Sequence, residues 1–206
     1  MKIWGRRNST NVKKVLWCAE ELGIQYEQID AGGAFGKVSE PEYRALNPNG
    51  LIPTVQEDDG FVLWESNAII RYLAVEYGNS SLYPEKARQR ACIDQWMDWG
   101  SSSIAPPYRD IFVNLIRTPA DKRNLQAVES GMKRCEQLFE IADKALDKQA
   151  YFGSDTFSIA DISIGPYIYA WLELPIQRPR YAHLLSWYER LKNRPAFAKT
   201  VMLPLS

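Results

Sequence analysis

A proline at the entrance of a predicted β-strand limits how this chain can fold. It stands in the segment Gly50–Val55, which reads Gly-Leu-Ile-Pro-Thr-Val. Because proline has no N–H to donate to a neighbouring strand, Pro53 is expected at a sheet edge or in a turn. An X-Pro bond is also the common place for a cis peptide, which reverses the chain and exposes the N–H and C=O of Ile52.

Glu65 and Ser66 follow where the next predicted strand gives way to a helix. They add a carboxylate, a hydroxyl and the free N–H groups of a helix N-terminus to those of the Ile52–Pro53 turn. This set of groups suits an extended, peptide-like ligand that carries a charged amino-acid head.

Patterns typical of strands and helices alternate in the first third of the chain. A strand, a helix and a second strand at its start imply a parallel pair with a right-handed crossover. The sequence Asp58-Asp59-Gly60 indicates a tight hairpin. The resulting order, β-α-β-α-β-β-α, is that of a thioredoxin-like α/β fold. The predicted strands are Lys2–Gly5, Tyr26–Ile29, Thr54–Glu57 and Phe61–Trp64, and the predicted helices are Asn11–Leu22, Glu40–Leu46 and Glu65–Tyr77.

The rest of the chain has helical patterns only. The turn-rich segment Gly78–Pro84 indicates a linker, and Pro106-Pro107 and Thr118-Pro119 interrupt the helices. We therefore expect an α/β domain over residues 1–78, a linker over 79–85 and an all-helical domain over 86–206. The predicted helices of that second domain are Lys86–Ser103, Asn124–Leu146, Ile159–Leu172 and Tyr181–Asn193.

Composition argues against several classes of partner. Lys plus Arg and Asp plus Glu both number 25, so no bulk charge attracts nucleic acid or an anionic membrane. No segment reaches the roughly 18 apolar residues of a membrane span. The cysteines Cys18, Cys92 and Cys135 are widely spaced, which argues against disulfides and metal sites and favours a reducing cytoplasm. Gly32–Gly36 does not match the glycine pattern of a dinucleotide site.

The segment Phe157–Ile162 predicts the start of a buried helix. Ser158 and Asp161 have the spacing of a capping box, flanked by apolar residues that suit a hydrophobic staple. A catalytic Ser–Asp pair is the other, less favoured interpretation. Cys18 lies about two turns inside the first predicted helix and has no second cysteine beside it, so we expect a buried, unreactive thiol.

The turn Gly5–Asn11 leads into the first helix and could activate a thiol. Ser9, Thr10 and Asn11 all suit an N-cap, and a hydroxyl there could also donate to a thiolate at the positive end of the helix dipole. Lowering a thiol pKa by about two takes about 2.7 kcal/mol. One hydrogen bond to a charged group supplies roughly 1.5–3 kcal/mol and a helix terminus about 0.3–1 kcal/mol. Neither a metal nor a base such as His183, the only histidine, is required.

These motifs together resemble the cytosolic glutathione transferases, in particular their bacterial, serine-type, theta-like branch. The resemblance extends over essentially the whole chain. The segments that carry it are Ser9–Val15 (Ser-Thr-Asn-Val-Lys-Lys-Val), Asn47–Pro53 (Asn-Pro-Asn-Gly-Leu-Ile-Pro), Glu65-Ser66 and Ser158–Asp161.

The resemblance implies a role for each part of the site. Ser9 donates its hydroxyl to the sulfur of glutathione, with Asn11 as the alternative donor. Ile52 offers its backbone N–H and C=O to the cysteinyl residue of glutathione and is held by a cis Pro53. Glu65 and Ser66 bind the γ-glutamyl amine and carboxylate. Glutathione is therefore the implied co-substrate, and the resemblance implies no metal.

Leu51 departs from the family pattern, in which Lys or Gln is common at this place. The usual contact to the glycyl carboxylate of glutathione is therefore in question, and Asn49, Lys37 or the pair Arg6–Arg7 could replace it. The alternative for the basic residues around the first helix is a solvated surface. These residues are Arg6, Arg7, Lys13 and Lys14.

In the family the second substrate binds between the two domains. The candidates are Trp99, Tyr108, Arg109 and Phe112, from the start of the helical domain. Arg109 stands in an apolar, aromatic stretch, where a buried charge needs a partner. That partner is either an anionic substrate, such as a haloacid, or a carboxylate of the protein.

By this resemblance the chain is a homodimeric, cytoplasmic enzyme of detoxification that attacks a small electrophile, for example a halogenated compound, with the glutathione thiolate. Two alternatives stay open. One is glutathione-dependent reduction of peroxides or disulfides at the same site, and the other is a relative that binds ligands without catalysis. The intact pairs Ile52-Pro53 and Glu65-Ser66 argue against the second alternative.

Overall fold

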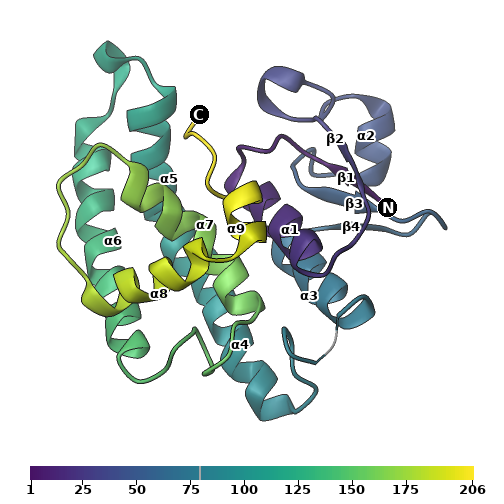
Figure 1. The fold of residues 1–206 in the computed structure, drawn as a ribbon. Coiled ribbons are helices and arrows are strands. Elements are labelled where there is room, and N and C mark those ends of the chain that lie inside the picture. The colour runs from purple at the N-terminus through teal and green to yellow at the C-terminus, as the bar shows by residue number, and fades with distance from the viewer. Residues whose placement is uncertain (79) are drawn as a thin grey trace.

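The computed structural model describes residues 1–78 and 80–206, and in it an α/β part packs against a larger helical part (Figure 1). Within the described residues, the α/β part contains one four-stranded sheet with the order β2-β1-β3-β4. The strands are β1 (Lys2–Trp4), β2 (Glu27–Ile29), β3 (Thr54–Gln56) and β4 (Val62–Trp64).

The pairing of these strands brings three chain segments to one edge of the sheet. β1 and β2 are parallel, as predicted, whereas β3 is antiparallel to both β1 and β4. Thr54 at the start of β3 pairs with Trp4 at the end of β1 and with Trp64 at the end of β4. The residues after β1, before β3 and after β4 therefore share this edge.

The helices of the α/β part confirm the predicted thioredoxin-like order. They are α1 (Thr10–Glu21), α2 (Pro41–Leu46) and α3 (Ser66–Glu76), with a short 3₁₀ turn η1 (Gly33–Phe35) before α2. Each of the three α-helices begins and ends within one residue of its predicted bounds. The predicted division into domains around residues 79–85 stays a prediction, and residue 79 lies outside the described residues.

The helical part begins with α4 (Ala87–Trp99), η2 (Gly100–Ile104), α5 (Ala105–Phe112) and η3 (Val113–Arg117). It continues with η4 (Ala120–Lys122), α6 (Leu125–Leu146), α7 (Ile159–Glu173), α8 (Ala182–Lys192) and α9 (Pro195–Thr200). Helix α9 was not predicted from the sequence. The last helix is therefore α9, and His183 lies in α8. Its side chain is exposed, and its Nε2 is 3.5 Å from Oδ1 of Asp147.

The break predicted at Pro106-Pro107 is wrong. Helical structure runs without interruption from Ala87 to Arg117. The two prolines sit in the first turn of α5, where a missing N–H costs least, and the wider π-helical turns of η2 and η3 lie on either side. A π-helical turn shifts the hydrogen-bond pattern, so the helix continues past residues that cannot donate.

Helix α1 packs against α3, α7 and α9 and so joins the two parts of the molecule. Its Trp17 is fully buried between Phe157 and Phe197, with ring centroids 5.5 and 4.7 Å away. The solvated surface considered for Lys13 and Lys14 is wrong, because these side chains are only 3% and 1% exposed. Each ammonium instead lies over an aromatic ring of α7, Tyr169 or Tyr167, at 4.8 and 4.7 Å.

The predicted capping box at the start of α7 is confirmed. Asp161 is fully buried and accepts hydrogen bonds from the N–H groups of Ser158 and Phe152 at 2.9 and 3.0 Å and from the Trp187 indole at 2.8 Å. Burial raises the pKa of this carboxyl to about 6, although these donors oppose the rise. Every contact of Asp161 is structural, which leaves no catalytic role for the pair Ser158–Asp161.

Cys18 is fully buried in α1, and burial raises its pKa, as expected of an unreactive thiol. Across residues 1–78 and 80–206, no helix is both long and apolar enough to cross a membrane. The same described residues contain no group of three or more His, Cys, Asp or Glu side chains arranged to hold a metal ion.

Candidate active site

Three of the predicted site segments meet at the edge of the sheet defined by Trp4, Thr54 and Trp64. The turn Gly5–Ser9 leaves β1 there, Ile52–Pro53 enters β3, and Glu65–Ser66 leaves β4 for α3. A Cβ added to Gly5 would lie 3.3 Å from the Cβ of Ile52, so the first two segments are in contact. The register of three short strands therefore assembles the site from segments far apart in the sequence.

Ser9 is the N-cap residue of α1, but its side chain makes no capping hydrogen bond. Its backbone N–H donates to the carbonyl of Arg6 at 3.1 Å, and its carbonyl accepts from Lys13 at 2.9 Å. Within the part of the chain that the structure describes, the hydroxyl is left available beside the positive end of the helix. Such a hydroxyl can donate to an anion at this place.

Asn11 is exposed in the first turn of α1. Its side-chain oxygen lies 3.5 Å from the hydroxyl of Tyr167, at the limit of a weak hydrogen bond. The neighbouring Thr10 hydroxyl lies 3.4 Å from that of Tyr108. The side chains of Asn11 and Thr10 thus lie at hydrogen-bonding distance from hydroxyls of the helical part. The Ser9 hydroxyl has no hydrogen-bond partner within the described residues, which favours Ser9 over Asn11 as the free donor.

The peptide bond Ile52–Pro53 is cis, as the resemblance implied. The turn before it is fixed by the buried Asn47 and Tyr43, which donate to the carbonyl of Leu51 at 2.9 and 2.6 Å. Both side chains also bond the Thr54 hydroxyl, at 3.1 and 2.9 Å. These four bonds hold the turn from behind, so the backbone groups of Ile52 can face a ligand.

Glu65 adopts a positive φ of 71°, which is unusual for a residue other than glycine. It is the exposed N-cap residue of α3, while Ser66, in the first turn, is only 7% exposed. Such strained conformations cluster at ligand sites, where the surrounding structure maintains them. The carboxylate of Glu65 can accept from an ammonium, and the N-terminus of α3 can bind a carboxylate.

The structure separates the candidates for the glycyl carboxylate. Asn49 is committed to its own loop, because both its backbone and its side-chain nitrogen donate to Asn47. Arg7 lies on another surface, in a hollow of about 350 Å³ shared with Glu20 and Lys199. The side chain of Arg6 packs against Gly33, where an added Cβ would lie 2.9 Å from its Nη1.

Lys37 follows the glycine-rich loop Gly32–Gly36. A Cβ added to Gly32 would lie 2.9 Å from the Cδ1 of Ile52, so this loop contacts Ile52. Lys37 also has a positive φ, 67°. Leu51 is 63% exposed and supplies no polar side chain here. Of the candidates, Arg6 and Lys37 therefore remain, because both adjoin the loop that contacts Ile52.

Lys14 lies behind this site and is fully enclosed. Its ammonium is 3.3 Å from the hydroxyl of Tyr167. Burial lowers the pKa of Lys14 to about 7, while the negative charge of Glu65 acts in the opposite direction. Sequence reasoning missed this link between α1, α3 and α7, because nothing in a Lys-Lys pair shows which face of a helix is covered.

The predicted residues for the second substrate do not form one group. Tyr108 and Phe112 of α5 are buried, with ring centroids 5.5 Å apart, and Tyr108 reaches Thr10 beside Ser9. Trp99 packs instead against Trp96, 5.0 Å away, whose other aromatic contact is Phe152.

The expectation of a buried Arg109 is wrong. Its side chain is exposed, because positions 108, 111 and 112 form the covered face of α5 and position 109 falls on the opposite side. Within the described residues Arg109 has neither an ion pair nor a hydrogen bond. Arg117, at the end of η3, was not among the predicted site residues. Its Nη2 donates to the backbone oxygen of Ser206, which also accepts from Nδ2 of Asn8 in the loop before Ser9.

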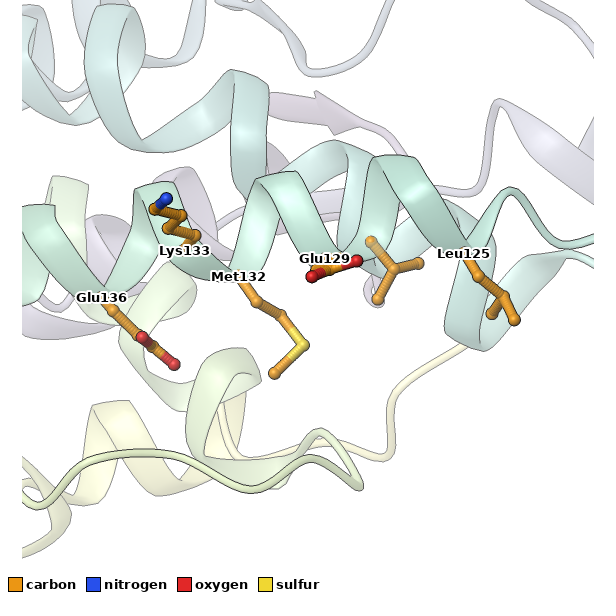
Figure 2. Close-up of a pocket in the computed structure, with 6 residues that line it drawn as sticks. Leu125, Glu129, Met132, Lys133 and Glu136 are labelled. Atoms are coloured by element: carbon orange, nitrogen blue, oxygen red, sulfur yellow. The ribbon is translucent and has the colours of Figure 1, made fainter.

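A groove of about 300 Å³ on α6 is shown in Figure 2. None of the predicted site residues contributes to it. Its lining is Leu125, Val128, Glu129, Met132, Lys133 and Glu136.

Comparisons with known proteins identify the family of this chain. The family model described as glutathione S-transferase, N-terminal domain, matches residues 1–75, and the model of the C-terminal domain of the same family matches residues 125–190. The chain is 42% identical to glutathione S-transferase GstB of Escherichia coli over 205 residues, which cover 99% of each protein. It is 29% identical to a probable glutathione S-transferase of Oryza sativa, GSTF1, over 99% of this chain and 97% of that protein.

Solved structures give the same result. The theta class glutathione S-transferase of Xanthomonas axonopodis pv. citri, with glutathione bound, superimposes with a TM-score of 0.96 at 49% identity, covering 100% of this chain and 98% of that one. Glutathione transferase F7 of Populus trichocarpa gives a TM-score of 0.86 at 26% identity, covering 98% and 99%. The full-length identity and the two domain models show that this chain belongs to the glutathione S-transferase family.

Proposed function

We propose that this chain binds glutathione at the sheet edge and holds its sulfur as a thiolate at Ser9. The observation that carries this proposal is the free hydroxyl of Ser9: an N-cap serine normally bonds the first turn of its helix, and this one does not. Its position at the N-terminus of α1, beside the cis Ile52–Pro53 turn, is where a cysteinyl sulfur would lie if Ile52 paired with that residue.

The same edge of the sheet supplies groups that would bind the γ-glutamyl and glycyl residues of glutathione. Glu65 accepts from the γ-glutamyl ammonium, and the N-terminus of α3 with Ser66 binds the γ-glutamyl carboxylate. Lys37 is the cation that we assign to the glycyl carboxylate in place of a residue at position 51. Arg6 borders the glycine-rich loop through its contact with Gly33. Asn49 would contribute to glutathione binding by fixing the shape of its loop through its hydrogen bonds to Asn47.

The thiolate then attacks the electrophilic carbon of a small substrate placed against Tyr108 and Phe112. A carbon–sulfur bond forms and the bond to the leaving group breaks, so the leaving group departs with its electron pair. Binding both reactants side by side and keeping the sulfur ionised supply the acceleration. The proposed cellular role is detoxification in the cytoplasm.

We also propose that the protein acts as a homodimer. Large apolar side chains of the α/β part are exposed on the β3–β4 hairpin and on α3 and just beyond it, which a second copy could cover. They are Phe61, Trp64, Val75 and Tyr77. Sedimentation analysis of the purified chain should give twice the mass of one chain.

The central test is Ser9→Ala. We expect the pKa of glutathione bound to this variant to rise by about one to two, because a hydrogen bond to the thiolate is lost. The pKa is read from the ultraviolet absorbance of the bound thiolate against pH. Ser130→Ala, on the exposed face of α6, is the matched control and should leave the titration unchanged. If Asn11→Ala raises the thiol pKa and Ser9→Ala does not, the donor is Asn11.

A further inference from the structure

A chain of hydrogen bonds runs from the buried Lys14 to the first turn of α1. The Lys14 ammonium donates to the hydroxyl of Tyr167 in α7 at 3.3 Å, and that hydroxyl donates to Oδ1 of Asn11 at 3.5 Å. Lys14 follows Asn11 by about one helical turn, and side chains of a helix lean toward its N-terminus, so the ammonium reaches back toward Asn11. Helices α1 and α7, which supply these residues, pack side by side (Figure 1).

The available donors and acceptors fix the direction of this hydrogen-bond chain. An ammonium can only donate, so the oxygen of Tyr167 accepts from Lys14. The hydroxyl hydrogen of Tyr167 then needs another acceptor, and within residues 1–78 and 80–206 it reaches only Oδ1 of Asn11. A flipped Asn11 amide would leave this buried hydrogen without an acceptor, at a cost of about 1–3 kcal/mol. Lys14 and Tyr167 therefore select one orientation of the Asn11 amide.

Tyr167 is itself held in place. Its side chain is buried, and its ring meets the ring of Tyr108 edge-on, with centroids 5.2 Å apart. The Lys14 ammonium lies 4.7 Å from the centroid of the same ring. Because Tyr167 cannot swing away, the orientation that it imposes on Asn11 is present before a ligand binds.

The selected orientation turns the amide nitrogen of Asn11 away from Tyr167. Asn11 is exposed, and its Nδ2 has no hydrogen-bond partner within the part of the chain that the structure describes. Ser9 and Asn11 are two positions apart, which is about 200° around a helix axis, so they flank the N-terminus of α1 from two sides. An anion placed over the end of this helix can therefore be reached by both side chains.

We propose that Lys14 and Tyr167 are positioning residues that hold the Asn11 amide with its nitrogen toward the glutathione sulfur, so that Asn11 adds a second hydrogen bond to the thiolate beside that of Ser9. This inference rests on the proposed function. Lys14 and Tyr167 touch neither reactant and act through Asn11.

The charge of Lys14 fits this role. Burial lowers its pKa to about 7, but the negative charge of Glu65 favours the ammonium. A glutathione thiolate at Ser9 would add a second negative charge on the same side. Binding of the thiolate and retention of the Lys14 proton therefore favour each other.

The test measures the pKa of bound glutathione from the ultraviolet absorbance of its thiolate. Tyr167→Phe removes the hydroxyl and keeps the ring. We expect the thiol pKa to rise by about 0.5–1, roughly half the effect of losing a donor outright, because the Asn11 amide is no longer held in one orientation. Tyr169→Phe is the matched control. Tyr169 lies in the same helix beneath the buried ammonium of Lys13, but its hydroxyl donates to the carbonyl of Leu203, so the thiol pKa should not change.

A double variant shows whether Tyr167 acts through Asn11. If it does, Asn11→Ala with Tyr167→Phe should raise the thiol pKa no further than Asn11→Ala alone. Effects that add would overturn the inference.

Lys14→Met tests the start of the hydrogen-bond chain and should raise the thiol pKa at least as much as Tyr167→Phe. Lys13→Met removes a similarly buried ammonium, which donates instead to the carbonyl of Val201, and should raise it less. Equal effects of the two lysine variants would mean that only net charge matters and that Lys14 has no positioning role.

The outcomes separate the inference from the proposed function. If the wild-type protein lowers the pKa of bound glutathione and Ser9→Ala raises it, while Tyr167→Phe behaves like Tyr169→Phe, the positioning role is wrong and the proposed function stands. If the folded protein neither binds glutathione nor lowers its thiol pKa, both are wrong. A thermal midpoint for each variant checks that a change in the thiol pKa does not come from unfolding.

Discussion

At the level of single residues, Lys14 shows how burial opposes the charge of a side chain near the candidate active site. It is enclosed by Tyr167 and feels the negative charge of Glu65, and its pKa falls to about 7 because burial disfavours the ammonium. In the unfolded chain a lysine keeps its proton to a pKa of about 10.4. Between these values the unfolded state binds more protons, so the free energy of unfolding rises with pH.

Lys14→Met removes this titration. Relative to the wild-type protein, we expect the variant to lose about 2 kcal/mol of stability between pH 7 and pH 9, because only the wild type gains from releasing the Lys14 proton. Urea unfolding at the two pH values measures the difference, in which the other titrating groups cancel. Lys148→Met, at an exposed position, should follow the wild-type curve. Parallel curves for Lys14→Met and wild type would contradict the prediction.

Other residues show how far the sequence alone could go. Ile52-Pro53 and Glu65-Ser66 lie at one edge of the sheet, as expected, because local backbone signals placed them: a turn before a strand and the start of a helix. Their roles in binding glutathione stay a prediction. The environment of Arg109 was predicted wrongly, because an apolar neighbourhood in the sequence does not tell which side of a helix is covered. The same reason explains why Lys14 was missed.

At the level of elements, the start of α7 depends on one carboxylate. Asp161→Ala would leave the N–H groups of Ser158 and Phe152 and the indole of Trp187 buried without an acceptor. Each unsatisfied buried donor costs about 1–3 kcal/mol, so we expect the free energy of unfolding to fall by at least about 3 kcal/mol. Urea denaturation followed by circular dichroism measures it.

The matched control is Asp155→Ala, in the exposed loop just before α7, which should change stability by less than about 0.5 kcal/mol. Equal, small effects for the two variants would show that the donors around Asp161 find other acceptors.

Elements with strong local signals were predicted well, and those without them were not. The helices α1, α6 and α7 have clear apolar periodicity, or a cap at their start, and their bounds agree within about a turn with the prediction. The break predicted at Pro106-Pro107 was wrong because a pair of prolines ends a helix only where the turn before it cannot widen. Helix α9, from Pro195 to Thr200, is too short for periodicity to show.

At the level of the whole molecule, the active site depends on tertiary arrangement. The βαβ start and the hairpin could be predicted, and they imply the sheet. The convergence of Arg117 and Asn8 on the backbone oxygen of Ser206 could not be predicted, because these three residues are far apart in the sequence. The packing of α1 against α3, α7 and α9 holds the two parts in the position that this contact needs.

That packing allows a test at Gly165, in the middle of α7. A Cβ at this position would lie 2.6 Å from Cζ3 of Trp17, which is fully buried and has no room to move. Gly165→Ala should therefore reduce the free energy of unfolding by about 1–3 kcal/mol, the usual effect of overpacking. Tryptophan fluorescence and helical circular dichroism should change together in one transition.

Gly100→Ala is the matched control. Gly100 is also helical, but an added Cβ would meet only Ile164 and Ser163, at 3.5 and 3.7 Å, which is ordinary contact. Alanine is favoured over glycine in a helix by about 0.8–1.0 kcal/mol, so this variant should be at least as stable as the wild type. If Gly165→Ala is equally stable, α1 and α7 can move apart without loss, and the joint between the two parts is looser than the close approach of Gly165 to Trp17 indicates.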